Sequence, residues 1–260
     1  MSKKAILVVS YGTSFKDTME KTINATEKAM AAAFPDYELR TAWTSRAVIK
    51  VAEKKMGRHF PFIDEVLESM AKEGFEEIVV QSTHIMNGLE YDFVTESVRK
   101  YRDKFKSVKI GSPLLTTEED YDRAIDLIEK ELVPLADGGA LLLMGHGTVH
   151  PANATYSQLQ LKLFDRGLYQ VYVTTVEGFP NYESTLKMMK SHSSKKVALV
   201  PFMLVAGDHA NNDLAGDDED SLKNIMTANG YDVKCIVKGL GEMPSFQKLF
   251  VEHAKNAKEF

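Results

Sequence analysis

Residues 141–148 of the chain have the sequence LLLMGHGT, an apolar run that stops at a histidine held between two glycines. An uninterrupted apolar run of this kind predicts a strand buried on both faces, as in a parallel sheet. The glycines allow a tight turn and the close approach of another molecule. We therefore expect His146 to lie at the carboxyl end of a buried strand, where open α/β sheets bind their ligands.

The composition is that of an ordinary globular protein, with 44% hydrophobic and 27% charged residues in 260. The net charge of −5 gives no broad basic surface for nucleic acid. The single cysteine, Cys235, excludes an internal disulfide and favours a reducing compartment. The apolar segment Ala5–Val9 is too short for a secretory signal, and no run approaches the ~18 residues of a membrane span. These features predict a cytoplasmic protein with no membrane partner.

Strands alternate with helices along the whole chain, which predicts βαβ units and parallel sheets. The expected strands are 5–9, 37–43, 78–81, 108–110, 141–144, 170–176, 196–201 and 233–237, and the expected helices are 15–33, 45–56, 62–72, 91–104, 117–132, 154–164, 182–190, 218–228 and 244–258. The stretch 134–139 is the best linker candidate. We therefore expect an N-terminal α/β domain, residues 1–135, and a C-terminal α/β domain, residues 136–260, that carries the metal site.

The second half repeats the order of elements in the first. In this repeat Tyr11 corresponds to His146, Thr44 to Glu177, and Glu90 to His209. The simplest interpretation is two related α/β domains whose strand ends face each other across a cleft.

Three polar residues of the second half each follow a different predicted strand. His146, Glu177 and His209 are separated by 31 and then 32 residues, about one strand–helix unit each, so all three can meet at one end of a sheet. Two imidazoles and a carboxylate suit a divalent metal such as cobalt, nickel, iron or zinc. They also suit proton abstraction near neutral pH, where histidine titrates.

Each of these residues also has a structural interpretation. His146 alone is explained by a hydrogen-bonded strand end, Glu177 by a helix cap or a lysine partner, and His209 by a surface loop. Because the three residues are expected to converge at one end of a sheet, we favour a role in metal binding or proton transfer over these structural roles. In the first half, Tyr11, Thr13 and Ser14 offer hydroxyls and amides at a helix start, which suits an anion, although ordinary capping explains them equally well.

Four segments carry a resemblance to a known family: residues 6–14, 145–148, 175–180 and PFMLVAGDH at 201–209. They resemble the anaerobic cobalt chelatases of the CbiK type, which act on sirohydrochlorin, and the likeness spans nearly the whole chain, including THIMNGLE at 83–90. The resemblance implies two α/β domains related by pseudo-twofold symmetry, with the tetrapyrrole in the cleft between them. It also implies a lyase that inserts Co²⁺ into sirohydrochlorin without ATP during cobalamin synthesis.

The matching motifs imply roles for individual residues. His146 would be the principal proton acceptor and a metal contact, His209 the second metal ligand, and Glu177 a third ligand or the partner that orients an imidazole. Glu90 would assist in proton removal. The substrate of the family is rich in carboxylates, so Tyr11, Thr13, Ser14 and Thr148 would bind its edge.

Three alternatives stay open at this point. The same fold could insert iron or nickel, or the protein could bind a tetrapyrrole or a metal without catalysis. A metal-dependent hydrolase is the third, but it would need a nucleophile or water-activating acid, and the sequence shows none in a recognisable motif. The sequence does not decide whether the protein forms a homo-oligomer.

Overall fold

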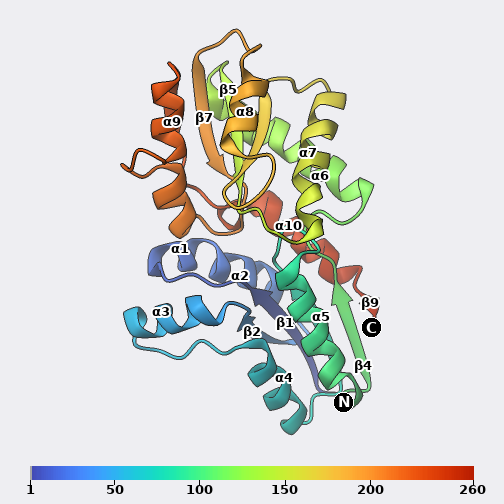
Figure 1. The fold of residues 1–260 in the computed structure, drawn as a ribbon. Coiled ribbons are helices and arrows are strands. Elements are labelled where there is room, and N and C mark those ends of the chain that lie inside the picture. Colours follow the sequence, from blue (N-terminus) through green and yellow to red (C-terminus); the bar gives the residue numbers. More distant parts are fainter. Residues whose placement is uncertain (1) are drawn as a thin grey trace. The chain divides into compact units, whose positions relative to one another are not determined.

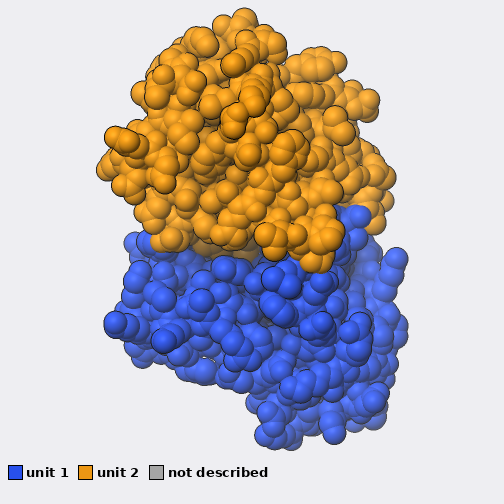
Figure 2. Space-filling model, in the orientation of Figure 1, with its two compact units in different colours: residues 1–116, 241–260 blue, residues 117–240 orange. Residues whose placement is uncertain are grey.

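The computed structural model describes residues 2–260, which form two compact units. Among these residues, unit 1 comprises 2–116 and 241–260, and unit 2 comprises 117–240 (Figure 2). Each unit is a mainly parallel sheet with helices between its strands (Figure 1), so the predicted α/β class is confirmed. No helix among the described residues is long and apolar enough to cross a membrane.

Unit 1 contains a five-stranded sheet in the order β2-β1-β3-β4-β9, in which only β9 runs antiparallel. Its strands are β1 (Lys4–Ser10), β2 (Glu38–Trp43), β3 (Glu77–Ser82), β4 (Ser107–Gly111) and β9 (Lys258–Glu259). Its helices are α1 (Lys16–Lys21), α2 (Ile23–Ala33), α3 (Arg46–Met56), α4 (Ile63–Lys72), α5 (Leu89–Tyr101) and α10 (Pro244–Lys255), with short 3₁₀ turns at Arg102–Lys104 and Leu240–Glu242.

Unit 2 contains a four-stranded parallel sheet in the order β6-β5-β7-β8. Its strands are β5 (Ala140–Gly145), β6 (Val171–Thr175), β7 (Lys196–Pro201) and β8 (Asp232–Cys235). Its helices are α6 (Glu118–Leu127), α7 (Ala154–Asp165), α8 (Tyr182–Met189) and α9 (Leu222–Ala228), with π-helical turns at Ile128–Leu132 and Ala210–Leu214 and 3₁₀ turns at Val133–Ala136 and Pro151–Asn153. Every residue of β5 is buried, as the apolar run predicts.

The two sheets share one strand order, with the second strand at one edge and the first strand between the second and the third. The first strand is β1 in unit 1 and β5 in unit 2, and the third is β3 or β7. This order supports the repeat seen in the sequence. In such sheets the connections leave the first and third strands toward opposite faces, which opens a ligand-binding crevice at their carboxyl ends. In unit 2 that place lies beyond β5 and β7.

Local sequence explains where several helices begin and how they pack. The Ser45 hydroxyl accepts the Val48 N–H and caps α3. The predicted helix 15–33 is interrupted at Thr22, whose hydroxyl donates to the Thr18 carbonyl. The helix expected at 218–228 begins later, because the Ser221 hydroxyl accepts the Asn224 N–H and caps α9, so the acidic run 217–220 precedes the helix.

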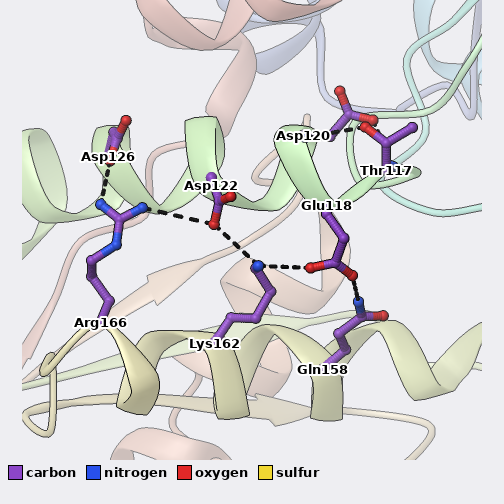
Figure 3. A network of polar contacts seen from close by, with 8 residues as sticks. All are labelled: Thr117, Glu118, Asp120, Asp122, Asp126, Gln158, Lys162 and Arg166. Carbon is purple, nitrogen blue, oxygen red and sulfur yellow. Dashed lines mark hydrogen bonds and ion pairs between the residues drawn. The ribbon is translucent and has the colours of Figure 1, made fainter.

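The units divide the chain differently from the expected boundary at 135, because two segments pack across it. Residues 117–135 belong to unit 2, where α6 lies beside α7. Figure 3 shows Lys162 and Arg166 of the α7 segment paired with acids of α6. Lys162 lies 2.8 Å from Glu118 and 3.1 Å from Asp122, and Arg166 lies 2.7 Å from Asp126. Residues 241–260 belong to unit 1, because α10 packs on α2 and β9 pairs with β4.

Candidate metal-handling site

His146 lies directly after β5, at the carboxyl end of the sheet of unit 2. The backbone of Gly147 has a φ of +81°, a left-handed conformation that favours glycine, and it turns the chain sharply after the histidine. The imidazole is part-exposed, and its Nδ1 lies 2.8 Å from the Gly147 carbonyl oxygen. A carbonyl can only accept, so Nδ1 carries the hydrogen and Nε2 presents its lone pair.

His209 lies beyond β7 and immediately precedes the π-helical turn Ala210–Leu214. Its Nδ1 lies 2.8 Å from Oδ2 of Asp213, one turn later in the same segment. An ionised carboxylate accepts only, so this contact fixes the hydrogen on Nδ1 and leaves the Nε2 lone pair free to bind.

The two imidazoles meet at their remaining nitrogens. Nε2 of His146 lies 3.0 Å from Nε2 of His209, and the rings are nearly perpendicular at 87°. With both hydrogens on Nδ1, two lone pairs point at one space, an arrangement that a cation stabilises. A metal held at the usual ~2.0–2.1 Å from both nitrogens would have an N–metal–N angle of about 90°. The pair therefore suits two adjacent positions of a divalent metal.

Glu177 completes the predicted group. Within the described residues, His146, Glu177 and His209 form a cluster with one ligand atom each, all within 4.8 Å of one another. The nearest approach to His146 is 3.9 Å, from Oε2 of Glu177 to Nδ1. The Glu177 side chain is 57% exposed, so its carboxylate can exchange protons with water. The predicted convergence of the three residues is therefore present.

The glycines around these ligands have a different role from the expected one, which was to leave room for another molecule. A Cβ on Gly145 would lie 2.2 Å from Cε1 of Tyr156, and a Cβ on Gly147 would lie 2.7 Å from the Gly178 nitrogen. Side chains and backbone of unit 2 already fill these spaces. The glycines permit close internal packing beneath the ligands.

Two apolar residues that lie close to the ligands in the sequence have strongly exposed side chains. Val149, three residues after His146, is 98% exposed, and Phe179, two residues after Glu177, is 57% exposed. Neither was singled out from the sequence.

The residues predicted in unit 1 lie at the carboxyl ends of its strands. Tyr11 is 39% exposed, whereas Thr13 is buried and its hydroxyl accepts the Phe15 N–H. Ser14 accepts from Lys55 Nζ at 3.4 Å. In unit 2, the Thr148 hydroxyl accepts the His150 N–H. The hydroxyls of Thr13, Ser14 and Thr148 thus have local partners, and binding of substrate by them stays a prediction.

Glu90 lies in the first turn of α5, where a carboxylate is favoured by the helix dipole. Its Oε2 atom is buried and has no hydrogen-bond partner among the described residues. Nearby in the sequence, His84 is bonded through Nδ1 to the Ser82 hydroxyl at 2.6 Å, and burial lowers its pKa to about 4. Trp43 is buried and stacks on Phe60 with ring centroids 4.1 Å apart, so it is a core residue.

Known proteins resemble the chain over its whole length. A family model described as "Cobalt chelatase (CbiK)" matches residues 4–259. A curated protein of Salmonella typhimurium named sirohydrochlorin cobaltochelatase is 36% identical over 255 residues, covering 98% of this chain and 96% of the relative. A protein of Nitratidesulfovibrio vulgaris named sirohydrochlorin cobaltochelatase CbiKC is 30% identical over 262 residues, covering 97% and 90%.

Solved structures show the same fold at low sequence identity. SirB from Bacillus subtilis with Fe³⁺ has a TM-score of 0.64 at 14% identity, covering 98% of this chain and 95% of that one. A structure of CbiX, described as the terminal enzyme for siroheme biosynthesis in denitrifying bacteria, has a TM-score of 0.55 at 15% identity, covering 98% and 99%. These matches support the chelatase-like fold.

Proposed function

Because the chain belongs to the cobalt chelatase (CbiK) family, we propose that it inserts Co²⁺ into sirohydrochlorin without ATP. The curated relatives named for this activity align with nearly the whole chain. The observation that carries the proposal is the pair of Nε2 atoms of His146 and His209, 3.0 Å apart. These two nitrogens could bind a divalent metal transiently before its transfer to the ring.

Neutral imidazoles suit a metal that must be released again. They bind first-row divalent ions well, but they do not hold cobalt as strongly as thiolates would. The only cysteine, Cys235, lies in β8 and is not part of the cluster. Ligand exchange from imidazole to ring nitrogen can then proceed without an external energy source.

Insertion also releases two protons from the ring nitrogens, and the same cluster can accept them. When Co²⁺ passes from His146 and His209 to the ring, each Nε2 lone pair becomes available to a proton. The two positive charges that leave the site with Co²⁺ are thus replaced by the two protons from the ring, so the net charge of the site is unchanged. Glu177, exposed and 3.9 Å from Nδ1 of His146, would pass protons to water.

The surroundings of the cluster fit a macrocycle. For the central nitrogens to reach the metal, the ring must cover a disc several ångströms wide around the histidines. Phe179 lies two residues from Glu177, within about 7 Å along the chain, and Val149 lies three residues from His146, within about 11 Å. Their exposed side chains would pack on the ring. From unit 1 we propose Glu90 as a proton acceptor and Tyr11, Thr13 and Ser14 as contacts of the carboxylates, together with Thr148 of unit 2.

The deciding experiment mixes the purified protein with sirohydrochlorin and Co²⁺ and follows the absorbance of the macrocycle. We expect insertion well above the uncatalysed rate, with no requirement for ATP. A rate equal to the background, with binding of the ring retained, would refute catalysis and leave a binding protein. Parallel reactions with Fe²⁺ and Ni²⁺ determine the preferred metal.

Two variants separate the roles of the imidazoles. We expect His146→Ala to lose insertion while the protein stays folded, because the side chain is part-exposed at a strand end. We expect His209→Ala to raise the Co²⁺ concentration needed for half-maximal rate by at least about 10-fold, as for loss of one ligand. Normal turnover in His146→Ala would remove this residue from the mechanism.

We place the reaction in the cytoplasm. This placement fits a chain whose single cysteine, Cys235, is a free thiol, as is usual in a reducing compartment. A homo-oligomer is also open to test, by sedimentation of the purified protein across a range of concentrations.

A further inference from the structure

Helix α7 and the residue just before it fill the spaces beside both ligand loops. The space that a Cβ would take on Gly145 is occupied by the ring of Tyr156. The corresponding space on Gly178, next to Glu177, is occupied by the side chain of Asn153, whose Oδ1 lies 2.3 Å from the position of such a Cβ. Tyr156 belongs to α7, and Asn153 directly precedes it.

Tyr156 holds the backbone that carries His146. Its side chain is 1% exposed, and its hydroxyl lies beside the backbone of Gly145 and near the N–H groups of His146 and Gly147. Burial raises the pKa of this hydroxyl to about 12, so it stays protonated in the physiological range. The hydroxyl therefore lies against the backbone just after β5 ends.

Asn153 ties the His146 loop to the Glu177 loop. Its Oδ1 accepts the Thr148 N–H at 3.1 Å, and its Nδ2 donates to the Phe179 carbonyl at 2.7 Å. The backbones are also joined directly, since the Glu177 N–H donates to the His146 carbonyl at 2.8 Å. The two ligand loops are therefore linked at both the backbone and the side-chain level.

The helix that supplies these contacts is itself well anchored. Its buried stripe of Tyr156, Leu159 and Leu163 faces the core of unit 2. On another side, Lys162 and Arg166 pair with acids of α6 (Figure 3). An anchored helix gives the ligand loops a fixed support.

We propose that Tyr156 and Asn153 are positioning residues, which hold the His146 and Glu177 loops so that the imidazoles of His146 and His209 face one Co²⁺ ion. Neither side chain touches the metal in this role. The inference rests on the proposed function for its choice of metal, but metal binding can be measured without the ring. Outer partners of metal ligands typically contribute 10–100-fold to metal affinity.

The test measures Co²⁺ affinity directly, by the visible absorbance of the bound ion, in the absence of sirohydrochlorin. Tyr156→Phe keeps the aromatic ring and removes only the hydroxyl. We expect it to weaken Co²⁺ binding about 10-fold. The matched control is Tyr231→Phe, which removes another buried hydroxyl of unit 2, bonded to the Met189 carbonyl and not to a ligand loop. We expect Co²⁺ binding in this control to equal that of the wild type.

Asn153 provides a second, independent variant, because its side chain is only half-buried and its loss is tolerated more easily. Asn153→Asp retains an acceptor for the Thr148 N–H but can no longer donate to the Phe179 carbonyl. We expect a loss of Co²⁺ affinity close to that of Asn153→Ala. If the melting temperature of Tyr156→Phe is far below that of Tyr231→Phe, the Co²⁺ affinities of Asn153→Asp and Asn153→Ala test the positioning role instead.

The outcomes separate the two proposals. Co²⁺ affinities of Tyr156→Phe and Asn153→Asp within twofold of the wild type would overturn the positioning role, whatever the insertion rate. A wild-type protein that binds Co²⁺ but does not metallate the ring would refute the proposed function, while a weakened affinity in the variants would still support positioning.

Discussion

The Nδ1 atom of His209 lies 2.8 Å from Oδ2 of Asp213. The two residues are four apart, and the π-helical turn between them places both side chains on one face. This carboxylate fixes the tautomer and the orientation of the imidazole, so that the opposite nitrogen can bind a metal. Asp213 was not among the residues that the sequence suggested.

Replacing Asp213 by Asn tests this contact. The amide retains the shape of the side chain but lacks its charge, so the imidazole becomes a weaker ligand. We expect Co²⁺ affinity to fall about 10-fold, measured by titration of the pure protein. Asp218→Asn removes a charge from an exposed acid further along the same stretch and serves as the control; equal losses in both variants would indicate a general effect of charge.

Glu90→Gln tests proton removal. The buried Oε2 has no partner, so the glutamine keeps the size of the side chain while it loses the ability to accept a proton. We expect kcat to fall about 10²-fold, the low end for a positioned base, while the Co²⁺ requirement stays unchanged. Glu96→Gln, at an exposed acid of the same helix, controls for charge. Unchanged kcat in Glu90→Gln would exclude a role in proton transfer.

Phe179→Ser tests the apolar contact with the ring. The exposed phenyl group contributes to affinity only when a ligand covers it, and its partial burial stabilises binding by about 1–2 kcal/mol. We expect KM for sirohydrochlorin to rise roughly 5–30-fold with little change in Co²⁺ affinity, and Phe179→Leu to give an intermediate value. If both variants keep the wild-type KM, the ring does not lie on this side chain.

His84 predicts a pH dependence of stability. Burial lowers its pKa to about 4, below the unfolded value of 6.5, so its stabilising contribution is complete above pH 6.5 and is lost as the pH falls toward 4. Between pH 6.5 and pH 5 this loss amounts to roughly 2 kcal/mol. We expect His84→Gln to reduce, by about that amount, the drop in the free energy of unfolding measured with urea at the two pH values.

His59 should behave in the opposite way. Hydrogen bonds to Glu53 and then to Glu65 raise its pKa, so its contribution is present below pH 6.5 and is lost as the pH rises through the folded value. The residue is exposed, so the change on His59→Gln should be small. A pH dependence of the same sign in both variants would show that global charge, and not the local environment, controls the effect.

The strand ends were predictable from the sequence because each combines a buried apolar run with a polar residue that cannot continue the strand. This reasoning located His146, Glu177 and His209 and the elements that bring them together. It also found the repeat, since the order of elements survives where residue identity does not.

What the sequence did not reveal depends on packing between distant segments. Gly145 suggests open space when considered alone, because nothing near it in the chain indicates that Tyr156 will fill that space. Asp213 lay within an expected loop, and only the π-helical turn brings it against His209. The break at Thr22 depends on one hydroxyl bond to Thr18, which the helical periodicity of residues 15–33 hides.

Unit 1 is built from two separate parts of the chain, whereas unit 2 is continuous, and this difference affects the order of events during synthesis. Residues 117–240 leave the ribosome as one uninterrupted stretch and have all their strands available before α10 is made. The sheet of unit 1 cannot be completed until β9 is synthesised, about 150 residues after its partner β4. Until then, the α2 surface that α10 will cover and the free edge of β4 are exposed to other nascent chains. Unit 2, which carries His146 and His209, can therefore be native before the sheet of unit 1 is complete.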